Sequence, residues 1–133
     1  MKTKLLLFLI AIAISGLQAV QAQSTTNHLD GKKYKIELKK DGTTESVETL
    51  IFTNDKLQTP DCNKYGFKEA KAYVKPTEDY FTWGSTISSE KEGVMAWQGT
   101  VKGDKIEGNC TWRKPGQDAI RYSFSGTELK ATK

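Results

Sequence analysis

Two segments of alternating apolar and polar residues, joined by a turn, lie between residues 94 and 112 of this chain. Large apolar side chains occupy alternate positions of both segments: Met95, Trp97, Val101, Ile106, Cys110 and Trp112. Gly103 and Asp104 stand between the segments. Because side chains of a β-strand point alternately to opposite faces, this pattern predicts an antiparallel hairpin with one face in a core and the other in water.

The same alternation begins near the start of the chain. Tyr34, Ile36 and Leu38 share one face of a strand predicted over residues 33–39, and lysines occupy the opposite face, where we expect them to be solvated. Residues 47–53 are rich in β-branched and aromatic side chains but show no single parity, which indicates a strand with a β-bulge. Further strands are predicted around residue 57 and over residues 70–74, 81–88, 94–102, 105–112 and 120–124.

About eight strands with short connections predict an all-β fold, an antiparallel up-and-down barrel. Closing a meander into a barrel removes its two open edges. An eight-stranded barrel has an interior just wide enough for side chains or for one small ligand. The longest irregular segment, residues 60–69, contains Pro60, Cys62 and Gly66 and is predicted to be a lid or a loop helix.

The first 22 residues have the features of a secretory signal peptide. Lys2 and Lys4 precede an apolar run over residues 5–14, and small residues precede a predicted cleavage site after Ala22. The run is shorter than the roughly 20 residues that a membrane-spanning helix requires, so no stable membrane span is expected. The sequence therefore predicts export to a periplasmic or extracellular location.

The remaining chain is predicted to form a flexible lead-in over residues 23–30 and one domain over residues 31–133. Two of the lysines lie in the predicted signal peptide, so the net charge of +4 overstates the basicity of the domain. The charges are also dispersed. No concentrated positive surface of the kind that binds nucleic acid is expected.

In architecture the chain resembles a small lipocalin, a calycin-type barrel. The resemblance lies in export, the opening Gly31-Lys32-Lys33-Tyr34, the eight-strand meander and the final Phe124-Ser125-Gly126-Thr127. A weaker similarity to avidin-type barrels lies in Trp97-x-Gly99-x-Val101, without the polar set that binds biotin. The resemblance implies reversible binding of a small apolar molecule.

The sequence gives little support for catalysis, a metal or a cofactor. The single histidine, His28, lies before the first strand, where it cannot be held as a general base. No spacing of His, Cys, Asp or Glu indicates a metal site, and no glycine-rich loop indicates a phosphate site. We therefore expect a protein without enzymatic activity or cofactor. The alternative is an enzyme using the loop carboxylates Asp61, Asp79, Glu90 and Glu92.

Cys62 and Cys110 allow two interpretations. Export favours a disulfide, which would require the loop over residues 60–69 to reach into one mouth of the barrel. Otherwise Cys110 is a small buried hydrophobe and Cys62 is a loop thiol.

Inward-facing aromatic residues are the best candidates for a ligand site. The predicted ligand-binding set is Tyr34, Trp83, Met95, Trp97, Trp112, Tyr122 and Phe124. They would either fill the barrel or leave a cavity against the three tryptophans, with Tyr122 and Thr49 as polar groups. No lysine or arginine clearly faces inward, so such a cavity suits a neutral apolar or aromatic ligand. The ligand would enter near residues 60–69.

The second hypothesis is a solid barrel that acts through its surface, as an inhibitor or accessory protein of an envelope or extracellular complex. Tyr65 and Phe67, in the irregular segment, would be exposed aromatic side chains of the type favoured at protein interfaces.

Overall fold

A computed structural model describes residues 28–130, and β-strands account for most of them. The elements are β1 (Lys33–Lys40), β2 (Thr43–Thr53), β3 (Lys56–Gln58), α2 (Pro60–Asn63), β4 (Ala70–Lys71), β5 (Tyr73–Pro76), β6 (Phe81–Ser89), β7 (Gly93–Lys102), β8 (Lys105–Arg113) and β9 (Ile120–Leu129). The predicted all-β fold is confirmed. In β1, Tyr34, Ile36 and Leu38 are buried, and the lysines at positions 33 and 35 point into solvent, as the alternation predicted.

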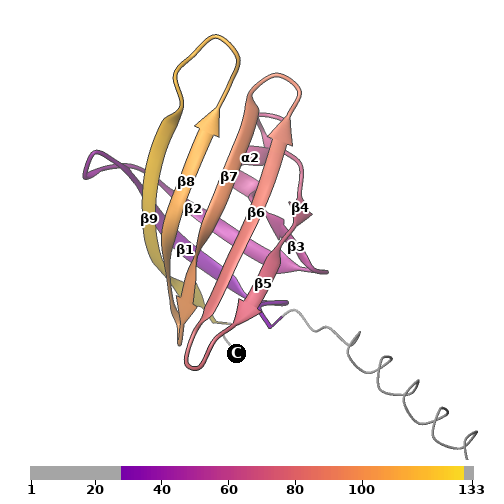
Figure 1. Ribbon diagram of the computed structural model, residues 1–133, viewed down its shortest axis with the longest axis vertical. Coiled ribbons are helices and arrows are strands. Elements are labelled where there is room, and N and C mark those ends of the chain that lie inside the picture. The colour runs from indigo at the N-terminus through magenta and orange to yellow at the C-terminus, as the bar shows by residue number, and fades with distance from the viewer. Residues whose placement is uncertain (1–27, 131–133) are drawn as a thin grey trace, which may run out of the picture.

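The strands form one antiparallel sheet in the order β4-β3-β2-β1-β9-β8-β7-β6-β5, and this sheet curls into a nearly closed up-and-down barrel. Most neighbours in the sheet are consecutive in the chain. The exception is the pair β1 and β9, which runs from Lys33 opposite Leu129 to Lys39 opposite Ser123. In Figure 1 the strands β6 to β9 cross in front of β1 and β2, with α2 at the same end as the β6–β7 turn.

The strand predicted over residues 70–74 is divided in two, which raises the number of strands to nine. β4 pairs with β3, whereas β5 pairs with β6, so the chain passes from one edge of the sheet to the other at Ala72. The Ser85 hydroxyl on β6 donates hydrogen bonds to the carbonyl oxygens of Lys71 (2.8 Å) and Ala70 (3.4 Å). This short segment therefore forms the seam at which the barrel closes.

Two glycines face each other across the β7–β8 pair. Gly99 is the register partner of Gly108, and a Cβ atom built on Gly108 would lie 2.0 Å from the carbonyl oxygen of Gln98. Side chains at these positions would force the strands apart. Glycine inside a strand often marks a close approach of two backbones, and this pair is such a place.

A chain of contacting aromatic rings fills much of the barrel. Tyr34 contacts Phe52 (ring centroids 5.9 Å apart), and Phe52 contacts Trp83 (5.0 Å). Phe124 then lies between Trp83 (5.9 Å) and Trp97 (5.4 Å). All five residues are buried. This part of the barrel has a packed aromatic core.

The residues just before β1 cover the end of the barrel opposite α2. Leu29 is fully buried, and the ring of His28 stacks on Phe81 at 5.2 Å. The amide of Gly31 donates to the carbonyl of Phe52. Within the predicted lead-in over residues 23–30, residues 28–30 thus lie against the barrel, with the apolar side chain of Leu29 buried in the core. Residues 23–27 and the predicted signal peptide lie outside the described residues.

A register shift in the β1–β2 pair confirms that β2 is irregular, but places the irregularity before residues 47–53. Leu38 pairs with Ser46 and Lys39 with Thr44, so Glu45 is the extra residue of a bulge. Beyond it, Leu50 and Phe52 are buried and Val47 is exposed, which settles the parity of the strand. Within residues 28–130 no helix is long and apolar enough to cross a membrane.

Candidate functional site

One mouth of the barrel is hollowed into a cavity of about 320 Å³, which we call the mouth pocket. Its apolar walls come from β1, β7, β8, β9 and the loop after α2; the remaining lining residues are polar or acidic. The lining residues are Leu38, Glu45, Ser46, Glu48, Asp61, Cys62, Tyr65, Phe67, Glu92, Met95, Trp112 and Tyr122. A volume of this size lies at the lower end of the range for small-molecule sites.

Three neighbouring strands supply one wall of the mouth pocket. Met95 on β7 is the register partner of Trp112 on β8, and both side chains line the cavity. Tyr122 on β9 is the register partner of Cys110, which is fully buried. Because residues two apart share a face, Cys110 and Trp112 both point inward, as the alternation predicted.

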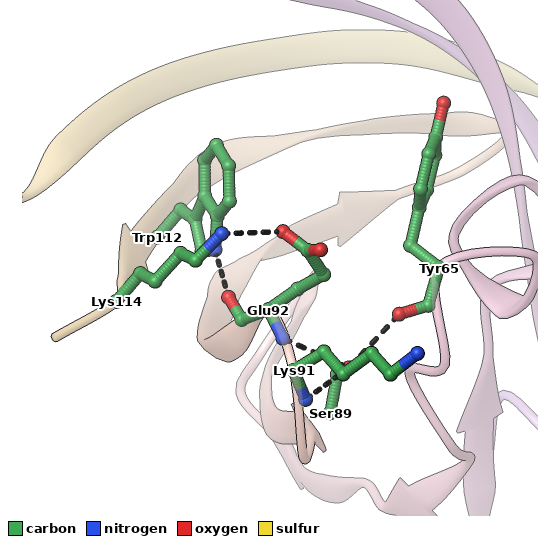
Figure 2. Close-up of polar contacts among 6 residues, drawn as sticks. All are labelled: Tyr65, Ser89, Lys91, Glu92, Trp112 and Lys114. Atoms are coloured by element: carbon green, nitrogen blue, oxygen red, sulfur yellow. Dashed lines mark hydrogen bonds and ion pairs between the residues drawn. The ribbon is translucent and has the colours of Figure 1, made fainter.

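The loop over residues 64–69 is fixed to the β6–β7 turn through Ser89. The Ser89 hydroxyl donates to the carbonyl of Tyr65 (2.9 Å) and accepts from the amides of Lys91 (3.3 Å) and Glu92 (3.1 Å), as Figure 2 shows. The close approach requires Gly66, which has a φ of +90° and leaves only 2.9 Å between a built Cβ and the Ser89 hydroxyl. Ser89 therefore holds the loop against the rim of the pocket.

Glu92 joins the β6–β7 turn to the end of β8. Its backbone carbonyl accepts a hydrogen bond from the Trp112 indole N–H, and its carboxylate forms an ion pair with Lys114 at 3.0 Å. Figure 2 shows the side chains of Trp112 and Tyr65 standing on either side of Glu92. These contacts fix the plane of the Trp112 ring at the pocket wall.

Three further carboxylates line the mouth pocket from the opposite side. Asp61 accepts a hydrogen bond from the backbone amide of Thr49 (2.8 Å), and Glu48 accepts one from the Ser46 hydroxyl (2.7 Å). The bulge at Glu45 directs that side chain to the same cavity. No lysine or arginine lines the pocket.

Both cysteines are free, buried thiols in this structure. Burial raises the pKa of Cys62 to about 12, with the Glu48 carboxylate, 3.8 Å from its Sγ, adding to the effect. Burial also raises the pKa of Cys110, with smaller contributions from negative charge on Cys62 and Glu48. The structure thus matches the second interpretation for Cys110, whereas Cys62 is buried rather than an exposed loop thiol.

The predicted ligand-binding set divides into two groups. Met95, Trp112 and Tyr122 line the mouth pocket. Tyr34, Trp83, Trp97 and Phe124 instead belong to the packed aromatic core, because each is buried against another ring of the set or against Phe52. Thr49 does not line the pocket and contributes its backbone amide to Asp61.

Several residues of the site were missed because they lie in turns, in a bulge or at outward parity. Glu45, Ser46 and Glu48 belong to the irregular part of β2. Ser89, which holds the loop, is a polar residue that is 8% exposed. Glu48 also lines the cavity, beside Cys62.

The aromatic residues of the irregular segment have different environments. Tyr65 is 56% exposed, as the surface hypothesis requires, but Phe67 is only 5% exposed and packs into the core. The predicted loop helix is the single turn α2, which leaves Cys62 buried. The loop thus presents one exposed aromatic ring rather than two.

Two other hollows lie on the outer face of the sheet. Their linings include outward side chains such as Lys35, Glu37 and Lys105, and the strand glycines leave room for them. Trp83 and Phe124 line one of them, but the rest of its lining is polar side chains and glycines. The mouth pocket instead has apolar walls from four strands and a loop, so we take it as the candidate site. Neither a family model nor a curated protein nor a solved structure matches this chain.

Proposed function

We propose that this protein is an exported, lipocalin-like barrel that binds a small apolar or aromatic molecule reversibly in the mouth pocket. The observation that carries the proposal is a cavity of about 320 Å³ with the apolar walls Leu38, Phe67, Met95, Trp112 and Tyr122. A site of this kind orients a ligand with a few polar groups at an apolar surface.

The organisation of the interior supports a mouth site over a central one. The aromatic core occupies the space around Trp83 and Trp97, whereas the pocket lies beside Trp112. The loop held by Ser89 forms part of the pocket wall, so the pocket is shaped without a ligand. A preformed cavity reduces the ordering cost of binding.

A role in binding without catalysis is part of the proposal. His28 stacks on Phe81 at the opposite end of β6 from the pocket. Of the four loop carboxylates considered for catalysis, Asp61 and Glu92 line the pocket. Asp79 pairs with Lys102 at 3.6 Å, and Glu90 lines an adjacent hollow instead of the pocket itself. These positions leave no histidine beside the pocket carboxylates among the described residues.

Titration with the neutral fluorescent probe N-phenyl-1-naphthylamine tests the proposal. We expect saturable binding to the folded protein, a stoichiometry of one, and loss of binding in Met95→Trp, which would fill the cavity. Tyr73→Trp, which adds an indole at an exposed position, is the control. Absence of saturable binding would contradict the proposal and favour the alternative, a barrel that acts through its surface on a protein partner.

A further inference from the structure

The mouth pocket has apolar walls but an excess of negative charge. Glu45, Glu48, Asp61 and Glu92 all line it. Of these four carboxylates, only that of Glu92 forms an ion pair with a residue that the structure describes, Lys114. Three carboxylates therefore remain without a cation.

The hydrogen-bond donors to these carboxylates are neutral groups. Glu48 accepts from the Ser46 hydroxyl and from the Cys62 thiol, and Asp61 accepts from a backbone amide. For Glu45, no hydrogen bond or ion pair is present within the described residues. The contacts of Glu48 and Asp61 fix the positions of these two carboxylates but leave their charge available to a ligand.

The negative potential acts on other groups in the cavity. The pKa of Tyr122 is raised, first by burial and then by the charges of Glu45 and of other groups that include Glu48. The pKa of Cys62 is raised first by burial and then by the charge of Glu48, with a smaller contribution from Asp61. A second negative charge in this space is therefore unfavourable, and a positive one is favoured.

Aromatic faces provide a further attraction for a cation. Trp112 and Tyr122 line the cavity, and Tyr65 at its rim already has the Lys64 ammonium 5.3 Å from its ring centroid. An organic cation gains both from carboxylates and from ring faces, whereas a metal ion requires ligands gathered at one point. No three acidic, histidine or cysteine side chains within residues 28–130 are gathered in that way.

We propose that the ligand of the mouth pocket is a small organic cation, an ammonium or quaternary ammonium group on an apolar body. This inference rests on the proposed function and replaces the neutral ligand that the sequence suggested. The cavity volume of about 320 Å³ lies at the lower end of the range for small-molecule sites, so the ligand is expected to be small. The cationic group lies near Glu45 and Glu48, and the apolar body lies against Met95 and Trp112.

Two probes of the same shape separate charge from apolar contact. Phenyltrimethylammonium and tert-butylbenzene each have ten non-hydrogen atoms and differ in one positive charge. Competition of each against N-phenyl-1-naphthylamine on the folded protein gives their relative affinities. We expect the cation to bind at least about tenfold more tightly, and this advantage to shrink in 1 M salt.

Charge-neutralising variants locate the effect. Glu45→Gln and Glu48→Gln should each weaken binding of the cation about threefold or more and leave binding of tert-butylbenzene unchanged. Glu78→Gln, an exposed position outside the pocket, makes the same change in net charge and is the matched control. Glu45 is an exposed bulge residue, so the Glu45→Gln variant should fold even if Glu48→Gln does not.

The outcomes distinguish the two proposals. Saturable binding of N-phenyl-1-naphthylamine with equal or weaker binding of the cation would overturn the charge inference and leave the proposed function intact. No saturable binding of any probe would overturn both. If Glu78→Gln reduced the tighter binding of the cation as much as Glu45→Gln does, the effect would come from the net charge of the protein. That result would overturn the proposed site.

Discussion

Replacing Phe124 by leucine tests whether the barrel interior is filled away from the mouth. Phe124 is 3% exposed and lies between two tryptophans. Its ring centroid is 5.9 Å from that of Trp83 and 5.4 Å from that of Trp97. Aromatic contacts of this geometry contribute about 0.5–1.5 kcal/mol each beyond the area they bury. Phe124→Leu removes two of them and leaves a small void, so we expect a loss of about 2–3 kcal/mol in the free energy of unfolding.

Urea denaturation followed by tryptophan fluorescence measures this loss. With a slope of about 1.5 kcal/mol per M urea, the midpoint should fall by about 1.5–2 M. Tyr73→Leu, which alters an aromatic residue that is 67% exposed, should change the unfolding free energy by no more than about 0.5 kcal/mol. N-phenyl-1-naphthylamine should bind the folded Phe124→Leu variant with unchanged affinity, because Phe124 does not line the mouth pocket.

A midpoint for Phe124→Leu within the range of the Tyr73→Leu control would refute this reasoning. It would mean that Phe124 has free space beside it and that the cavity extends to Trp83 and Trp97. Weakened probe binding would lead to the same conclusion, and the ligand site would then be the central one suggested by the sequence.

Three further predictions concern buried groups and the loop. Tyr34→Phe should leave the unfolding free energy unchanged or raise it in urea denaturation, because the buried Tyr34 hydroxyl has no hydrogen-bond partner within residues 28–130; a loss above 1 kcal/mol would reveal a missed partner. The unfolding free energy, measured at a series of pH values, should fall as the pH rises above about 9, because unfolded thiols and phenols lose protons that the folded protein retains. The pKa of Cys62 is raised from 9.0 to about 12, and the pKa of Tyr34 is raised from 10.0 to about 12. A constant unfolding free energy between pH 9 and 11 would contradict this prediction. Gly66→Ala should increase amide hydrogen exchange over residues 64–69, because the new Cβ meets the Ser89 hydroxyl at a positive φ; unchanged protection would show that the loop adapts without releasing Ser89.

The alternation of side chains predicted the strands well because each strand has one buried face. Residues 33–40 and 105–113 follow the predicted parity, and the barrel follows from short connections between consecutive strands. The seam was not predicted, because alternation says nothing about which neighbour a strand pairs with. Ala72 shows no signal that the strands on its two sides pair with different partners.

The candidate site was only partly predictable, since it depends on departures from regular structure. Trp112 and Met95 were found because they keep the strand period. Glu45 reaches the pocket through a one-residue bulge, and Asp61 and Cys62 reach it because α2 folds back along β2. Parity also could not separate inward aromatics that fill the core, such as Trp97, from those that line the mouth.

The pairing of β1 with β9 has a consequence for how the chain folds during synthesis. Until β9 has been made, both β1 and β8 keep an unpaired edge, and the apolar faces of the intervening strands have no closed interior to fill. The barrel can therefore close only late in the synthesis of the chain. Before it, the nascent chain is at its most vulnerable to aggregation and most dependent on chaperones.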